Sequence, residues 1–386
     1  MAERRGEGID MTALERPRAA ARSTAPRAVT VRAVTARGDD ERLAAGATAQ
    51  DVVLLATSGQ GVEATTRTGD EAWTVSTTLP SVRASCLAVH HGVPGLVYAG
   101  TRDRGVWRSE DRGTSWLPIG LAERDVTSLA VSRADPSLVY AGCKPASVFV
   151  SRDAGDSWHE LEAFRRVRRW YWASPAEPPD LRAYVMGLAA SPTDADVVVA
   201  GVEAGAVVRS ADGGRTWSPH RRAADRDCHA LTFHASDGRW VYEAGGGGPA
   251  VSRDAGEHWT HTVRGMAGRY GMAVAADPLR PEVWYVTAAP IWSPRAPLRM
   301  PLGHTEGGAM ATLYRSSGGA SWEPLRGGLP APLDHPPYGL ATTPAAPGHL
   351  YLGLSHGEVW HSSDHGDTWH RLPFRFSGIR RALAIA

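Results

Sequence analysis

The sequence contains a single lysine, Lys144, so nearly all of its 42 basic residues are arginine. Aspartate and glutamate together number 41, which leaves a formal net charge of only +1. A chain with so little charge imbalance has no overall electrostatic footprint for nucleic acid or for an anionic membrane surface. We therefore expect neither of them as a partner.

Cysteines and long apolar runs are also scarce. The three cysteines, Cys86, Cys143 and Cys228, form neither a disulfide framework nor a metal-binding spacing, and are expected to be reduced thiols of a cytoplasmic protein. No apolar run approaches the roughly 18–20 residues that a membrane span requires. No His, Cys or Asp pattern has the spacing of a zinc or calcium site, so we expect no metal and no cofactor.

Residues 1–48 differ in composition from the remainder. They are rich in alanine, arginine and threonine and lack the apolar core of a secretion signal. Such a composition does not support a packed core, so we expect a disordered N-terminal tail at 1–48 and one folded domain at 49–386.

An octet recurs along the folded part: Ser, any residue, Asp, any residue, Gly, any two residues, then Trp. Five complete copies begin at Ser109, Ser151, Ser210, Ser252 and Ser362. Two degraded copies end at Trp73 and Trp322. The basic spacing of about 42 residues is typical of a four-stranded propeller blade, so seven copies predict seven blades.

Each repeat unit also has a short strand-like segment with small residues before its octet. Examples are residues 85–90, 127–132 and 229–234. Short strands with small side chains suit the crowded inner ring of a propeller. The 42 glycines and 27 prolines fit the many turns that such a fold needs.

The two ends of the repeat region complement each other. The first unit, from residue 51 to Trp73, lacks an inner strand, whereas residues 381–386 read as an inner strand with no unit after it. Pairing the two would complete one blade and remove the exposed sheet edges of an open array. The sequence therefore predicts an all-β, seven-bladed propeller closed by its C-terminal strand.

The octets resemble the Asp-box, or BNR, repeats of sialidases, xyloglucanase-type glycoside hydrolases, sortilin-type receptors and photosystem assembly factors. The resemblance covers roughly residues 50–386. It implies the propeller fold, but enzymes and non-enzymes share the repeat, so it does not decide the function. In the family this turn joins the outer strands away from the ligand face, so we expect the five octet aspartates to be structural.

Two stretched spacings between repeats predict long loops on the ligand face, at residues 165–184 and 290–310. In the first loop, Arg169, Trp170 and Trp172 combine stacking faces with cations and form one candidate ligand-binding group. The alternative is that these aromatic residues only pack the loop against a neighbouring blade.

A second candidate site is expected where the inner strands begin, at the mouth of the central channel. Asp227, Glu203 and His229 are its candidate catalytic residues, because a histidine and carboxylates can exchange protons with a substrate. The alternative is that they only hold loop backbone through hydrogen bonds. Equivalent positions in other units add further candidate ligand-binding residues, namely Arg269, Tyr270, Tyr338 and His335.

Two functions fit these features. The first is a non-catalytic binding or scaffolding propeller whose partner is a glycan, a small molecule or a protein. The alternative is a glycoside hydrolase related to sialidases or xyloglucanases, with two carboxyl groups about 5–9.5 Å apart at the channel mouth. The sequence lacks the Arg-Ile-Pro motif of sialidases, and sialidases have six blades rather than the seven predicted here. Xyloglucanases place their substrate between two propellers, and a chain of 386 residues has room for only one. We therefore favour the binding protein.

Overall fold

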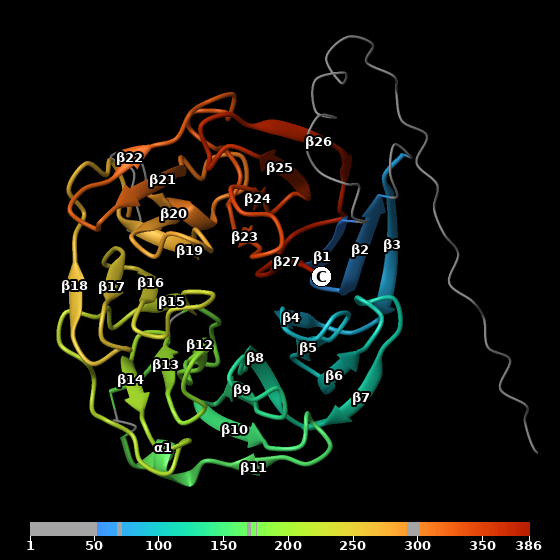
Figure 1. Ribbon diagram of the computed structural model, residues 1–386, viewed down its shortest axis with the longest axis vertical. Helices are drawn as coiled ribbons and strands as arrows, with labels where there is room; N and C mark the ends of the chain where they lie inside the picture. Colours follow the sequence, from blue (N-terminus) through green and yellow to red (C-terminus); the bar gives the residue numbers. More distant parts are fainter. Residues whose placement is uncertain (1–51, 68–71, 168–170, 175, 292–300) are drawn as a thin grey trace, which may run out of the picture.

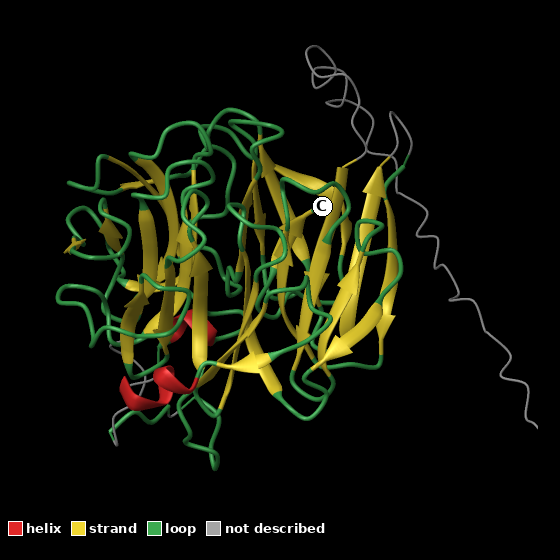
Figure 2. Ribbon diagram, turned by 60° about the horizontal axis from the view of Figure 1, so that its bottom comes forward, coloured by secondary structure: helices red, strands yellow, loops and turns green. Residues whose placement is uncertain are grey.

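The computed structural model describes residues 52–67, 72–167, 171–174, 176–291 and 301–386. Seven antiparallel sheets stand around a central axis, and the chain runs through them in order from blue to red in Figure 1. Figure 2 shows that strands dominate the fold and that loops join them at both ends. The predicted seven-bladed β-propeller is therefore confirmed. The expected tail at 1–48 lies outside the described residues.

Each blade is numbered by its place in the ring, and its strands run from the axis to the rim. Blade 1 contains β27 (Leu383–Ile385), β1 (Val52–Thr57), β2 (Gly61–Arg67) and β3 (Thr74–Pro80). Blade 2 contains β4 (Ala84–Val89), β5 (Val97–Thr101), β6 (Gly105–Ser109) and β7 (Leu117–Gly120). Blade 3 contains β8 (Asp125–Val131), β9 (Val139–Lys144), β10 (Ser147–Ser151) and β11 (His159–Glu160).

The other four blades follow the same plan, except that blade 4 has three strands. Blade 4 contains β12 (Val185–Ala190), β13 (Val198–Val202) and β14 (Ala206–Ser210), preceded by the helix α1 (Glu162–Val167). Blade 5 contains β15 (Cys228–Phe233), β16 (Val241–Gly245), β17 (Ala250–Ser252) and β18 (Trp259–His261). Blade 6 contains β19 (Tyr270–Ala276), β20 (Val283–Ala289), β21 (Thr312–Ser317) and β22 (Glu323–Pro324), with the short helix η2 (Leu302–His304) inserted between β20 and β21. Blade 7 contains β23 (Gly339–Thr342), β24 (Leu350–Gly353), β25 (Glu358–Ser362) and β26 (His370–Arg375).

The C-terminal strand closes the ring, as the sequence predicts. β27 pairs antiparallel with β1, and Leu383, Ala384 and Ile385 lie opposite residues 54–56. Leu383 packs with Ile379 in the buried cluster that joins blades 7 and 1. Because the first and last segments of the chain share one sheet, no seam is left with an open edge.

The two ends of the ring carry different connections, which define two faces. One side of the ring carries the octets, which connect third and fourth strands, and the turns that connect first and second strands. We call this side the octet face. The other side carries the connections from second to third strands and those that lead into the next blade. We call it the mouth face.

The complete octets share one hydrogen-bonding pattern. In each, the amide of the glycine donates to the buried serine Oγ at 2.7–2.9 Å, and one aspartate oxygen accepts the amide of the following Ser, Thr or His at 2.8–2.9 Å. The glycines have φ between 81° and 104°, a conformation that side chains disfavour. Each octet aspartate is thus occupied by its own turn.

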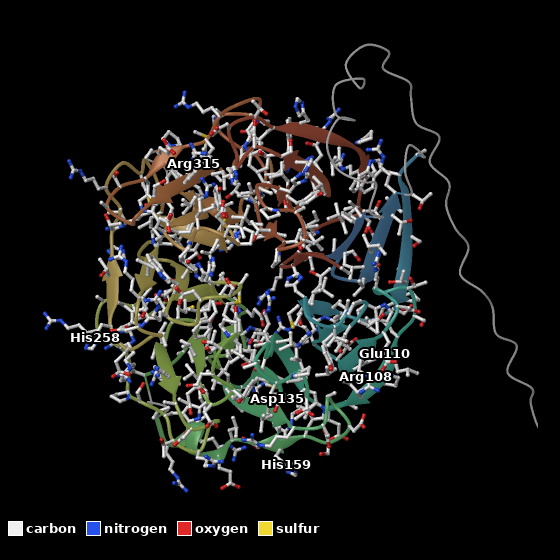
Figure 3. All side chains as sticks on the ribbon, viewed as in Figure 1. Arg108, Glu110, Asp135, His159, His258 and Arg315 are labelled. Carbon is white, nitrogen blue, oxygen red and sulfur yellow. The ribbon has the colours of Figure 1, made fainter. Side chains whose placement is uncertain are left out.

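Arginines connect neighbouring blades at the rim. Arg315 of blade 6 donates to the His365 carbonyl at 3.1 Å and to the Asp367 carboxylate at 2.7 Å in the octet of blade 7. Arg108 makes the matching pair of contacts with Ala154 and Asp156 in the next blade. In both arginines Nη1 bonds the carbonyl and the carboxylate of the neighbouring octet. Figure 3 labels Arg108 and Arg315 at the periphery.

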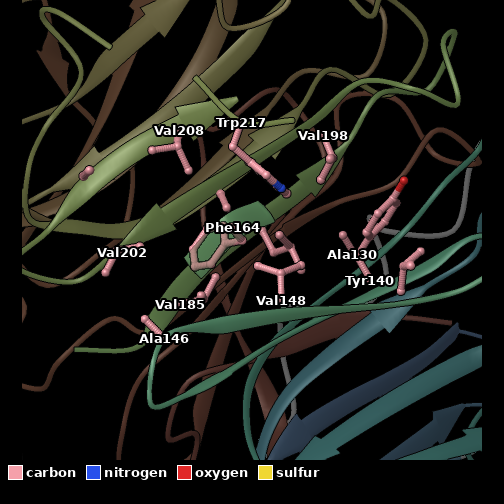
Figure 4. Packing of buried hydrophobic residues seen from close by; sticks show 14 of the residues in the cluster. Ala130, Tyr140, Ala146, Val148, Phe164, Val185, Val198, Val202, Val208 and Trp217 are labelled. Carbon is pink, nitrogen blue, oxygen red and sulfur yellow. The ribbon is translucent and has the colours of Figure 1, made fainter. Parts of the chain in front are cut away.

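Hydrophobic side chains fill the spaces between blades. Figure 4 shows the cluster around blades 3 and 4, in which Phe164 of α1 meets Trp217 edge-on, with ring centroids 5.2 Å apart. Close approach near the axis depends on glycine: a Cβ atom at Gly201 would collide with Cys228 of the next inner strand. Small residues are therefore required where strands of neighbouring blades pack closely near the axis.

Candidate site at the channel mouth

Polar and charged side chains gather on the mouth face around the channel. They come from three kinds of segment: loops after second strands, residues that precede or begin inner strands, and the two long insertions. Together they form two connected groups, one centred on Glu177 and one running from Asp227 to Tyr338.

Glu177, in the first long insertion, is held by three cations. Arg102, which follows β5, donates to it at 2.7 Å, and the Lys144 ammonium at the end of β9 lies 2.8 Å away. Arg381 approaches within 3.4 Å. The Arg102 hydrogen bond and the neighbouring positive charges lower the pKa of Glu177 to about 2. Arg102 also pairs with Asp125, so negative charge balances positive charge within this group.

Lys144 is the only lysine of the chain, and its side chain is just 2% exposed. Its ammonium also donates to the Asp180 carbonyl at 3.0 Å and lies 5.4 Å from the centre of the Tyr184 ring. A buried ammonium is costly unless its donors are satisfied, and here they are. Lys144 therefore fixes the first long insertion over blade 3.

Arg381 spans the channel. It precedes β27 of blade 1, yet its guanidinium reaches Met186 Sδ at 2.9 Å and the Tyr184 hydroxyl at 3.4 Å, both beside or within β12 of blade 4. Blades 1 and 4 are separated by two blades on one side of the ring and by three on the other. The closing segment thus places a cation across the opening.

Asp227 and His229 form an ion pair at the start of blade 5. The His229 Nδ1–H donates to the Gly271 carbonyl at 2.7 Å, and Nε2 lies 3.4 Å from Asp227 Oδ2. Burial by itself lowers the pKa of His229, but the hydrogen bond and charge of Asp227 reverse this and raise it overall. Burial likewise raises the pKa of Asp227, and His229 more than compensates, so it is lowered. Asp227 also accepts the amide of Ala204 at 3.2 Å.

Tyr270, His304 and Tyr338 form a row across blades 6 and 7. His304 Nε2 lies 2.9 Å from the Tyr270 hydroxyl, and its Nδ1 lies 2.8 Å from the Tyr338 hydroxyl. Partial burial, with the nearby charges of His229 and Arg381, lowers the pKa of His304 to about 4. A neutral imidazole donates through one nitrogen and accepts through the other, so only one of the two tyrosine hydroxyls can donate a hydrogen bond to His304.

Two further mouth carboxylates are also occupied. Glu203, after β13, is buried and accepts the Ser174 hydroxyl at 2.8 Å. Glu306, in the second long insertion, accepts from His335 at 2.9 Å and from Ser355 at 2.8 Å. Burial raises the pKa of Glu306, but these two hydrogen bonds lower it overall.

The structure brings most of the sequence-predicted mouth residues together. Glu203, Asp227, His229, Tyr270 and Tyr338 lie in the connected groups described above, and His335 stands beside them through Glu306. Their binding or catalytic roles stay predictions.

Other candidates are placed differently. Arg269 is exposed. Trp172 is only 4% exposed and packs near Phe164 in the core of blades 3 and 4, so it offers no face to a ligand. For Trp172 the packing alternative therefore applies. Arg169 and Trp170 lie outside the described residues.

Several mouth residues were not found from the sequence, among them Arg102, Lys144, Glu177 and Arg381. Each belongs to a different blade or insertion, and no local pattern joins them. The one available signal was the single lysine in an arginine-rich chain, which marked Lys144 as unusual.

Within the described ranges, no group of three or more His, Cys, Asp or Glu side chains is arranged to hold a metal ion. The three cysteines are free thiols. No helix in the described part of the chain has the length and apolar character needed to cross a membrane.

Fold and site define the protein as a seven-bladed β-propeller with a polar channel mouth. Its architecture is similar to that of GH74 enzymes in three crystal structures. An ancestral GH74 enzyme matches 74% of this chain at 17% identity, with a TM-score of 0.56. The Niastella koreensis GH74 enzyme matches 75% at 16% identity and a TM-score of 0.54, and the Xanthomonas campestris GH74 xyloglucanase matches 88% at 18% identity and a TM-score of 0.56.

This chain covers only 38%, 45% and 55% of those three enzymes. At such low identity the likeness shows the fold alone. No protein-family model matches the sequence, and no curated protein matches it.

Proposed function

We propose that this protein is a non-catalytic binding propeller of the Asp-box type whose mouth face binds a carbohydrate. The observation that carries the proposal is the bonding state of the mouth carboxylates. Glu177, Asp227 and Glu306 all have lowered pKa values and fixed partners. Among the described residues, the one neighbouring carboxyl whose pKa is raised, that of Glu243, is fully buried and out of reach of a ligand. Glycoside hydrolysis instead needs a carboxylic acid that keeps its proton near neutral pH beside a second, ionised carboxylate.

The neutral part of the mouth suits hydroxyl-rich ligands. Tyr270, His304 and Tyr338 are uncharged at pH 7 and can both donate and accept hydrogen bonds. The half-buried ring of Tyr338 provides apolar surface on which a sugar ring can pack. The second long insertion supplies His304, in keeping with the tendency of binding residues to occupy loops on a rigid scaffold.

The experiment pairs a glycan array with a hydrolysis screen on the full chain. We expect glycan binding without turnover, and a loss of about 5–30-fold in affinity for Tyr338→Phe, because a hydrogen bond to a ligand contributes about 1–2 kcal/mol. His159→Gln, at the rim (Figure 3), is the control and should bind normally. Absence of glycan binding, or an unchanged affinity for Tyr338→Phe, contradicts the proposal.

The second candidate function is a glycoside hydrolase, which the Asp227–His229 pair favours because a protonated imidazole beside a carboxylate can serve as an acid. Both ring nitrogens of His229 already face acceptors, however, so neither N–H is free for a leaving group. Turnover of a chromogenic glycoside that Asp227→Asn abolishes would establish this alternative. The cytoplasmic location expected from the cysteines stays a prediction.

A further inference from the structure

A second cavity opens at the opposite end of the channel, on the octet face. Its volume is about 340 Å³, within the range of small-molecule sites. The inner strands of all seven blades line it with leucine, alanine and valine side chains such as Leu87, Leu129 and Leu231, and its accessible surface is apolar and polar in similar measure. None of the mouth residues described above is part of its lining.

The lining also includes five polar side chains, those of His91, Arg133, Thr232, His234 and Thr342. His234 is occupied: Nε2 lies 3.0 Å from the Asp277 carbonyl, and Nδ1 accepts the amides of Ser236 and Asp237. His91 is neutral at pH 7, because burial and the neighbouring Arg133 lower its pKa to about 4. The lining includes no aspartate or glutamate.

Arg133 is the one charged side chain of the lining. Its Nη1 is buried and has no hydrogen-bond partner among the described residues. A buried donor without a partner costs free energy, and more so when it is charged. Burial lowers the pKa of Arg133, yet a guanidinium keeps its proton at neutral pH.

We propose that this cavity binds an amphipathic monocarboxylate, such as a medium-chain fatty acid. The alkyl chain would lie along the leucine, alanine and valine side chains of the channel, where burial of each methylene favours binding. The carboxylate would pair with the guanidinium of Arg133, the one cation of the lining, through a charge-assisted hydrogen bond. An acidic group fits better than a neutral or cationic one, because the lining offers a positive charge and no negative charge to compete for it.

The test is calorimetric titration of the full chain with decanoate, below its micelle-forming concentration. Acetate (the charge without the chain) and decan-1-ol (the chain without the charge) are the comparison ligands. We expect decanoate to bind at least tenfold more tightly than either. Equal or absent binding of decanoate would overturn the proposal.

Variants separate the two parts of the site. Arg133→Gln should weaken decanoate at least tenfold and leave decan-1-ol unchanged. Ala341→Phe, which fills the lumen from β23, should weaken both ligands. Arg104→Gln, an exposed arginine on the mouth face, is the matched control and should change neither.

Thermal melts check that each variant folds, so a loss of binding is not mistaken for unfolding. A decanoate affinity that Arg133→Gln leaves unchanged would overturn the role of the guanidinium. The site is independent of the mouth face: Tyr338→Phe should not affect decanoate, and Arg133→Gln should not affect glycan binding. Failure of one proposal therefore leaves the other testable.

Discussion

The octets at the rim of the ring and the residues at the channel mouth are built in opposite ways. At the rim, one short pattern repeats five times, and every aspartate bonds within its own turn. At the mouth, each residue occurs once, and several find partners on other blades, as Glu177 does with Arg102, Lys144 and Arg381. The rim thus repeats one local arrangement that keeps the blades alike, whereas the mouth is assembled from residues that do not recur from blade to blade.

Both the rim and the mouth depend on the closed ring, so opening the ring should have the largest effect. Deleting residues 383–386 removes β27 and the buried Leu383, and exposes the edge of β1. We expect Tm to fall by about 10 °C or more, or the chain to fail to fold. Thermal melts followed by circular dichroism measure this. Deleting Ala386 alone is the control, and equal stability of the two truncated forms would contradict the role of β27.

The rim should respond next most strongly to a single substitution. Ser362→Ala leaves the buried amide of Gly366 without its acceptor, which should cost about 1–3 kcal/mol. Urea unfolding measures the loss. Glu110→Ala, at a variable and exposed octet position (Figure 3), should change stability little. Equal effects of the two substitutions would show that the repeated serine is not a structural requirement.

The arginine contacts between blades should be sensitive to geometry rather than charge. Arg315→Lys keeps the charge but cannot bond Glu323 through Nε while Nη1 bonds the His365 carbonyl and the Asp367 carboxylate. We expect a loss of about 0.5–1.5 kcal/mol in urea unfolding. Arg326→Lys is the control. A fully stable Arg315→Lys protein would mean that charge alone suffices there.

Acid should weaken the rim through the octet carboxylates. Hydrogen bonds from Ser157 and Ser151 lower the pKa of Asp153 to about 2, below the usual value near 3.9. A depressed folded-state pKa contributes stability above the unfolded pKa and loses it as pH falls through the folded value, here between about 4 and 2. Urea midpoints measured from pH 5 to pH 2 should fall across this window. In Asp153→Asn the decline should be shallower, and an identical profile would contradict the assignment.

A residue behind the mouth should show the opposite pH dependence. Glu243 is fully buried, and burial raises its pKa well above the usual value. A raised carboxyl pKa costs stability as pH rises past the unfolded value, because the unfolded chain ionises first. Glu243→Gln should therefore give a small rise in Tm at pH 8 and little change at pH 4. A lower Tm at pH 8 would show that the ionised form is needed.

The same difference between repeated and unique residues decides which features of the structure the sequence predicts. The octets and the closing strand were predictable because their patterns are local and periodic. Glu203, Asp227 and Tyr338 were predictable as mouth residues because each lies at a strand end. The partners of Glu177 were not, since ion pairs between blades leave no trace in spacing. Trp172 shows the converse, because an aromatic side chain in a long loop does not reveal whether it points outward or into the core.

Arg381 gives the ring closure a second consequence. The segment that seals blade 1 also carries the side chain that touches blade 4 across the axis. Seating of the last strand and shape of the opening are therefore set by the same few residues. If the terminal segment detached, the molecule would lose both the strand that completes blade 1 and the Arg381 contact across the axis. It would then have neither a closed ring nor a complete mouth.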